Sequence, residues 1–225
     1  MNDYAPLRVK VWGDRACFTR PEMKVERVSY EVMTPSAARG LLEAIYWKPE
    51  FRWRILRIHV LKPIHHVSIL RNEVTKTISP GTVRNAFERG DGYVYFADDD
   101  RTQRHTLALR DVGYLIEAEV EPIGRGYEDH PAKHRDIFRR RVARGQCFHR
   151  PYLGCREFVA DFAEPDGSEH AIDRTDDLGR MLFDLRYELD GGRNVPLFFA
   201  ARLERGVLHV PQHLYDQTAP EVAAP

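Results

Sequence analysis

The residues best suited to chemistry in this sequence are the adjacent Lys133 and His134. A histidine has an unperturbed pKa of about 6.5, so it can give and take protons near neutrality. A neighbouring lysine can stabilise negative charge that develops on a phosphate. The two residues open a basic stretch that is predicted to be helical, and a helix N-terminus attracts anions. These features indicate phosphate chemistry, although an ordinary surface histidine in a basic helix explains the same pattern.

A second candidate is Tyr46, near the end of a predicted helix. It lies four residues after Leu42, so its ring shares the buried stripe of that helix. A tyrosine in this position can still bring its hydroxyl to the rim of a core. The alternative is a tyrosine that only packs in the core, and the residue types alone do not separate the two.

Other arrangements fail as metal sites. Cys147, His149 and Cys155 offer zinc ligands, but no fourth ligand at a standard spacing accompanies them. Three consecutive aspartates at 98–100 point in different directions, which is typical of a solvated loop. We therefore expect no metal site and no cofactor. The cysteines are odd in number and widely spaced, which favours reduced thiols over a disulfide framework.

The hydrophobic pattern predicts the elements that must position these residues. Thr34 is a typical N-cap and Pro35 a typical first helical residue, and Gly145 is expected to end the basic helix. The excursion at 71–106 should hold only short elements. The main predicted elements are a strand at 7–12 closed by Gly13, a helix at 35–47, strands at 55–61 and 67–70, a long strand at 107–123, a helix at 132–143 and a strand at 156–162.

That order of elements is the split βαβ arrangement, so we predict an α+β protein with a ferredoxin-like N-terminal domain. Three further strand-like runs, at 179–188, 196–203 and 206–210, predict a small C-terminal antiparallel sheet. The expected domains are residues 1–163 and 164–211. The tail at 212–225 is expected to be disordered.

Charge is unevenly distributed along the chain. The 34 basic and 34 acidic residues cancel, so the overall charge of a typical nucleic-acid binder is missing. Residues 133–156 are nevertheless strongly basic, whereas the stretch that follows is acidic. A basic face that meets phosphates and a merely solvated helix face both fit this pattern. No run approaches the roughly 18 apolar residues of a membrane span, so a cytoplasmic location is expected.

Several motifs in the same order carry a resemblance to a known family. They are FTRPEMKVERVSY at 18–30, TPSAARGL at 34–41, IYWKP at 45–49, KPI at 62–64 and YLGCREF at 152–158. With these motifs the chain resembles the CRISPR-associated RAMP proteins of the type I-C (Dvulg) system. The resemblance extends over nearly the whole chain.

The resemblance implies a ferredoxin-like (RAMP/RRM-like) N-terminal domain and a small C-terminal sheet. It also implies endonucleolytic processing of the CRISPR repeat transcript, with the protein staying on the 5′ handle inside an interference complex. By resemblance, cleavage is assigned to Tyr46, Lys133 and His134. Tyr46 lies inside the YWKP motif, whereas the loop before Lys133 does not align, so His130 competes with His134 for the same role.

Metal-independent RNA cleavage uses the 2′-hydroxyl of the substrate as the nucleophile. We hypothesise that His134 moves protons, Lys133 stabilises the phosphorane-like oxygens and Tyr46 positions these groups. The products would be a 2′,3′-cyclic phosphate and a 5′-hydroxyl. Two alternatives remain open, namely a non-catalytic RNA-binding scaffold and a metal-dependent nuclease that uses the aspartates at 98–100 or the acidic residues after Glu157.

The expected partners are CRISPR repeat RNA, through its hairpin and 5′ handle, and the other subunits of a type I-C complex. The hypothesis also allows secondary DNA binding, and no membrane is expected. Basic side chains would hold the RNA backbone. The expected RNA-binding residues are Lys24, Arg27, Arg139, Arg140, Arg144, Arg150 and Arg156.

Overall fold

The computed structural model describes residues 4–90, 92–123, 131–186 and 194–218. The helices are α1 (Pro35–Ile45), α2 (Pro80–Glu88), α3 (Pro131–Ala143) and α4 (Tyr215–Thr218), with short 3-10 helices η1 (Ala97–Asp100) and η2 (Gln212–Leu214). The strands are β1 (Leu7–Ala16), β2 (Arg27–Val28), β3 (Phe51–Val60), β4 (His65–Val74), β5 (Arg101–Pro122), β6 (Asp161–Ala163), β7 (Asp176–Arg186), β8 (Val195–Glu204) and β9 (Val207–His209).

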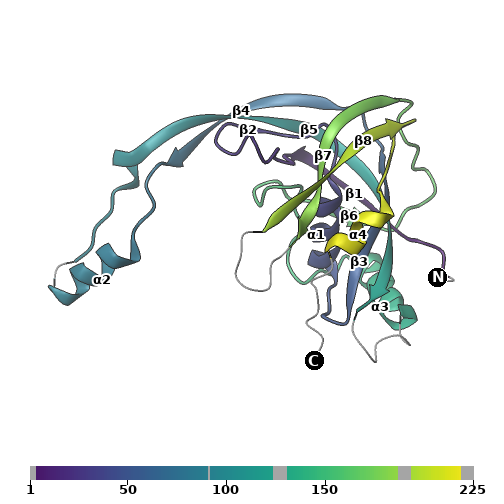
Figure 1. The fold of residues 1–225 in the computed structure, drawn as a ribbon, viewed down its shortest axis with the longest axis horizontal. Coiled ribbons are helices and arrows are strands. Elements are labelled where there is room, and N and C mark those ends of the chain that lie inside the picture. The colour runs from purple at the N-terminus through teal and green to yellow at the C-terminus, as the bar shows by residue number, and fades with distance from the viewer. Residues whose placement is uncertain (1–3, 91, 124–130, 187–193, 219–225) are drawn as a thin grey trace.

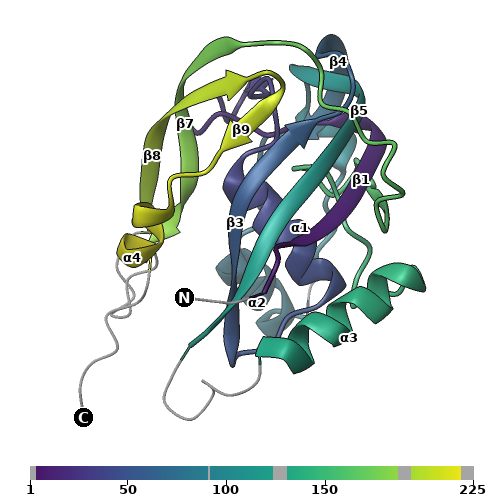
Figure 2. The ribbon, with the colours of Figure 1, turned by 90° about the vertical axis from the view of Figure 1, so that its right-hand side faces the viewer.

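The strands in the described residues form one curled, mainly antiparallel sheet. Its main path runs in the order β6-β1-β5-β3-β9-β8-β7, and β2 and β4 pair with β5 off this path. Figure 2 shows β1, β5 and β3 side by side, with β9, β8 and β7 beyond them. Helix α1 connects β1 to β3, and helix α3 connects β5 to β6. Alternate residues of β1 and β3, such as Val9 and Ile55, are buried in the same core as Ile45 of α1 and Phe138 of α3. Both helices therefore cover one face of the sheet, as the period-2 burial of the strands requires.

Strand β5 is much longer than its neighbours because it pairs with two strands on one side. Its C-terminal half pairs with β3, up to Val60 opposite Tyr114, and its N-terminal half pairs with β4, from His65 opposite Arg110. The pairing register with β5 barely changes between the end of β3 at Val60 and the start of β4 at His65. Together, β3 and β4 therefore form one arm of a long hairpin, interrupted at residues 61–64, and β5 forms the other arm. Figure 1 shows the outer half of this hairpin projecting from the rest of the molecule with α2 near its tip. The prediction of an excursion with short elements at 71–106 is confirmed in outline.

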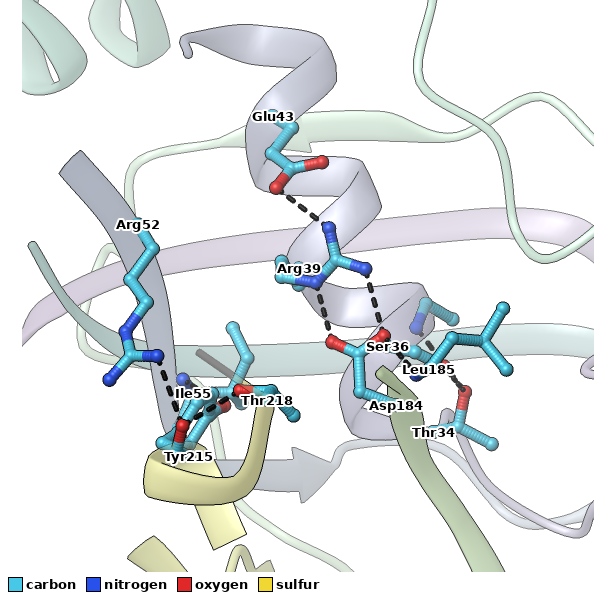
Figure 3. Close-up of polar contacts among 11 residues, drawn as sticks. Thr34, Ser36, Arg39, Glu43, Arg52, Ile55, Asp184, Leu185, Tyr215 and Thr218 are labelled. Carbon is cyan, nitrogen blue, oxygen red and sulfur yellow. Dashed lines mark hydrogen bonds and ion pairs between the residues drawn. The ribbon is translucent and has the colours of Figure 1, made fainter. Parts of the chain in front are cut away.

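The C-terminal strands join the sheet through β9, which pairs with β3. An ion pair also attaches them to α1, because Arg39 donates to Asp184 of β7 through Nε at 2.7 Å and Nη2 at 2.9 Å (Figure 3). The Asp184 carboxylate lies almost wholly buried at this contact. The sheet thus continues from one end to the other, and a separate domain at 164–211 stays a prediction.

Two sequence predictions need correction. Gly13 lies inside β1 and does not end it. A Cβ atom at this position would lie 2.6 Å from Leu153 Cδ1 and 2.8 Å from Val159 O, which is too close. The glycine instead allows the chain after α3 to approach the strand, and β1 continues to Ala16. The expected strand at 156–162 is mostly a turn, with Phe158 N–H donating to Cys155 O, and only Asp161–Ala163 pairs with β1.

The tail is folded over the part that the structure describes. Residues 212–218 form η2 and α4, and Tyr215 is buried with its hydroxyl accepting from Ile55 N at 2.7 Å. The expectation of disorder from residue 212 is therefore wrong for 212–218, and the rest of the tail lies outside the described residues. Among the described helices, none is long and apolar enough to cross a membrane.

Candidate active site

The structure brings Tyr46 and His134 into direct contact. Tyr46 is the C-cap of α1, an extended residue whose N–H donates to Leu42 O at 2.8 Å. His134 lies in the first turn of α3. The Tyr46 hydroxyl and His134 Nδ1 are 2.9 Å apart, a hydrogen bond between residues 88 positions apart in sequence. We call these two residues the Tyr46–His134 pair.

Contacts from Trp53, Phe51 and Arg141 hold the Tyr46–His134 pair. The Tyr46 carbonyl accepts a hydrogen bond from Trp53 Nε1 at 3.0 Å. The Phe51 ring packs on both members, with centroid distances of 5.6 Å to Tyr46 and 4.9 Å to His134. The Arg141 guanidinium lies 5.1 Å from the Tyr46 ring centroid and donates to Ile45 O at 2.7 Å. Neither ring of the pair is therefore free to swing away from the other.

The Tyr46–His134 pair is largely removed from water, with 3% of Tyr46 and 8% of His134 exposed. Burial raises the pKa of Tyr46, and the nearby Glu50 carboxylate raises it further, while Arg141 acts in the opposite direction. Tyr46 is consequently a neutral phenol near pH 7. A neutral phenol can donate to His134 Nδ1 or accept from it, so the hydrogen bond can hold the ring in either protonation state.

Lys133 lies next to His134 in α3 but is exposed. Successive helical residues point about 100° apart, so Lys133 and His134 leave the helix in different directions. The competing His130 lies outside the described residues.

The predicted RNA-binding residues separate into two groups. The first group, which we call the α3 group, lies on or just after α3 and contains Arg139, Arg140, Arg144 and Arg150, all exposed. Two of these arginines also contact carboxylates: Arg139 Nη1 lies 3.8 Å from Asp136, and Arg150 is paired with Asp161. Arg139 and Arg140 share helix α3 with His134, and Arg144 directly follows its last residue, so positive charge lies along the helix that carries His134.

The second group, formed by Lys24, Arg27 and Arg156, lies elsewhere. Arg27 is opposite Thr106 in β5, whereas Phe51 beside His134 is opposite Pro122. At a rise of ~3.3 Å per residue these points are on the order of 50 Å apart along the strand. Arg27 also donates to Cys155 Sγ at 3.3 Å and lies 3.6 Å from Glu157. Cys155 in turn donates to Cys17 O, which ties Arg27 to the chain near Arg156.

Carboxylates in the described residues do not converge on a metal site, since no group of three or more potential ligands lies together there. Asp100 contacts Lys76 Nζ at 2.7 Å, and Glu169 contacts Lys10 Nζ at 3.0 Å. Each acidic stretch that the metal-dependent alternative would use thus has a carboxylate engaged with a basic side chain.

Sequence reasoning missed Arg141 and Phe51, which hold the Tyr46–His134 pair. Arg141 follows His134 by seven residues, two turns of a helix, so the two share a face. That spacing could have indicated Arg141 as a neighbour of the site. Phe51 gave no such signal, because its position depends on strand β3 beginning next to α3.

Comparison with known proteins gives matches over almost the whole chain. The model of the family described as CRISPR-associated protein (Cas_Cas5) matches residues 6–211. A relative from Mannheimia succiniciproducens, named CRISPR pre-crRNA endoribonuclease Cas5d, is 47% identical over 218 residues, which cover 91% of this chain and 94% of the relative. A Thermus thermophilus protein of the same name is 46% identical over 230 residues, covering 95% and 94%.

A solved structure shares the fold. It is a Streptococcus mutans protein described as functionally uncharacterized, with a TM-score of 0.65, 23% identity and coverage of 94% of this chain and 96% of that one.

Proposed function

Because this chain belongs to the CRISPR-associated Cas5 family, in its Cas5d form, we propose that the Tyr46–His134 pair cleaves CRISPR repeat RNA. The family prediction from the sequence motifs is confirmed. Like the relatives that carry the name, the chain is a CRISPR pre-crRNA endoribonuclease. The single observation that supports this location of the active site is the 2.9 Å contact between the Tyr46 hydroxyl and His134 Nδ1.

The proposed reaction is an attack by a ribose 2′-hydroxyl on the adjacent phosphorus, which expels the 5′ oxygen of the next nucleotide. The products are a 2′,3′-cyclic phosphate and a 5′-hydroxyl. His134 moves the proton at one of these oxygens, and Tyr46 holds the imidazole in position through its hydrogen bond. The exposed Lys133, one residue away, stabilises the charge on the non-bridging oxygens. This route uses a nucleophile from the substrate itself and needs no metal ion.

We also propose the ferredoxin-like description of the N-terminal part. It is supported by the strand order β6-β1-β5-β3, with α1 and α3 as the two connecting helices. In this arrangement the first connecting helix ends just before β3 begins, and the second begins just after β5 ends. Because β3 and β5 are antiparallel, these two points lie at the same end of the strands. That geometry is what allows the C-cap of α1 to meet the first turn of α3.

The α3 group is proposed to hold the RNA backbone near the cut, with the hairpin and the 5′ handle as the bound parts. Retention of the handle would make the chain a subunit of the type I-C interference complex. DNA is proposed only as a secondary ligand, because the same guanidinium groups bind any phosphate backbone.

The test is a repeat RNA with a single 2′-deoxy nucleotide at the cleaved position. We expect this RNA to bind with unchanged affinity and to resist cleavage, while the all-ribose RNA is cleaved in the presence of EDTA. His134→Ala should bind the all-ribose RNA without cutting it. A cut in the 2′-deoxy RNA, or a requirement for a divalent ion, would refute the mechanism. Absence of cleavage by the wild-type chain would leave the scaffold role.

A further inference from the structure

Phe148 presents its ring to solvent beside the candidate active site. The side chain is 83% exposed, although the backbone is fixed: Phe148 N–H and His149 N–H donate to Ala44 O at 2.8 Å and 3.3 Å. These bonds seat the loop after α3 on the last turn of α1. Trp47, three residues after Ala44 and next to Tyr46, is 53% exposed. Two large aromatic side chains therefore face water at one end of α1.

Exposure of one ring alone is ordinary, but here two large exposed rings lie at the same end of α1, and the backbone of Phe148 is fixed by hydrogen bonds. Phe148 also does not pack on the core, so the fold gains little from its ring. The loop is held by backbone hydrogen bonds, which any residue could form. The ring is thus dispensable for folding and available for binding.

The surroundings of these aromatic rings are basic. Lys48 follows Trp47, while Arg144 and His149 lie on either side of Phe148 in sequence, and all three are exposed. Arg141 connects this surface to the site, since it donates to Ile45 O and lies over the Tyr46 ring. Aromatic rings among cations are the usual surface for single-stranded nucleic acid, because every base offers a face for stacking and every linkage a negative charge.

We propose that Trp47 and Phe148 stack on unpaired bases of the repeat RNA next to the cleaved linkage. The inference rests on the proposed function and adds the part of the substrate that is recognised there. Trp47 is covalently next to Tyr46, so its ring contacts the base nearest the cut, and Phe148 contacts a base further out. The two rings set the register in which the RNA enters the Tyr46–His134 pair.

The test measures binding of the 2′-deoxy repeat RNA to Phe148→Ala, Phe148→Leu and Phe148→Tyr. Phe148→Ala should raise the dissociation constant about tenfold, as loss of a stacked base requires. Phe148→Leu keeps apolar area without a ring and should bind as weakly, whereas Phe148→Tyr should bind like the wild type. Phe87→Ala is the matched control, because Phe87 is 82% exposed near the tip of the hairpin and should change binding less than twofold.

A second readout uses 2-aminopurine at successive unpaired positions of the same RNA. Stacking should quench its fluorescence at one position with the wild type, and Phe148→Ala should relieve the quenching there. Trp47→Ala and Trp47→Phe should give the same pattern one or more nucleotides closer to the cut. Quenching that is independent of both residues, or a Phe148→Ala effect below threefold, would overturn the inference and assign this surface to a protein partner. Wild-type cleavage of all-ribose RNA, measured alongside, would keep the proposed function intact in that event.

Discussion

Replacing Tyr46 by phenylalanine separates the hydrogen bond of the Tyr46–His134 pair from the packing around it. The phenylalanine ring keeps the contact with Phe51 at 5.6 Å and the place below the Arg141 guanidinium. The substitution removes only the hydroxyl that lies 2.9 Å from His134 Nδ1. Any change in rate therefore reports on the orientation and protonation of the imidazole.

The size of the effect follows from the burial of the hydrogen bond. A buried polar atom that loses its partner costs about 1–3 kcal/mol. If this stabilisation is present in the transition state, the cleavage rate should fall about tenfold to a hundredfold, at roughly 1.4 kcal/mol for each factor of ten. The free energy of unfolding should fall by about 1–2 kcal/mol, because the same bond stabilises the fold.

The assay is single-turnover cleavage of labelled repeat RNA at saturating enzyme, with the dissociation constant measured on 2′-deoxy RNA. RNA affinity should stay within twofold of the wild type. Tyr215→Phe is the matched control, because it also removes a buried hydroxyl, bonded to Ile55 N at 2.7 Å, but at the C-terminal end of the chain. Tyr215→Phe should lose stability and keep its rate. Equal rates for Tyr46→Phe and wild type, or equal losses in both variants, would refute the assigned role.

Three further predictions concern stability and binding. Asp184→Ala removes two hydrogen bonds from the Arg39 guanidinium, which keeps Glu43 as a partner at 2.8 Å, and should lower the free energy of unfolding by about 1–3 kcal/mol in urea denaturation; an unchanged free energy of unfolding would contradict the attachment of β7 to α1. The neighbouring His59, 3.3 Å away, and then a hydrogen bond from Arg57 lower the pKa of Glu117 from 4.5 to about 2, so its stabilisation is present above pH ~4.5 and is lost as the pH falls toward 2. In Glu117→Gln, the free energy of unfolding should change by about 3 kcal/mol less between pH ~4.5 and pH ~2 than in the wild type. An unchanged dependence of the free energy of unfolding on pH in this range would contradict the prediction. Arg144→Ala should reduce the slope of log affinity against log salt by about 0.7–0.9, and an unchanged slope would remove Arg144 from the RNA-binding face.

The sequence predicted the elements that have a regular pattern. Helix α1 begins at Pro35 after the N-cap Thr34, as predicted, because Thr34 Oγ1 accepts from Ala37 N–H at 3.3 Å. The long strand near 107–123 is present, but it begins at Arg101. Its first residues are polar because they lie in the hairpin that projects from the body, where neither face of the strand meets a core. Local pattern cannot show such a strand, since only the partner β4 defines it.

The candidate site was predictable in its residue types but not in its contact. Tyr46 was ambiguous between a core tyrosine and a functional one, and the structure shows that its ring is buried while its hydroxyl meets His134. His134 looked like a surface residue because its neighbours in sequence are charged. Its burial comes from Phe51, which is distant in sequence, so no local pattern reports it. The charge of Arg27 likewise predicts RNA binding together with the arginines of the α3 group, because the local sequence does not show that Arg27 lies far from them along β5.

The central place of β5 also determines the order in which the chain can fold during synthesis. Leu7 of β1 pairs with Ala118 of β5, and Phe51 of β3 pairs with Pro122 of β5. Both strands that flank β5 therefore leave the ribosome before β5 itself. Translation proceeds at about 5–20 residues per second, which leaves the apolar side of β1 without its partner for on the order of ten seconds. A nascent chain of this protein must therefore remain soluble with half a sheet exposed, and truncated chains that stop before residue 101 are expected to bind chaperones or aggregate.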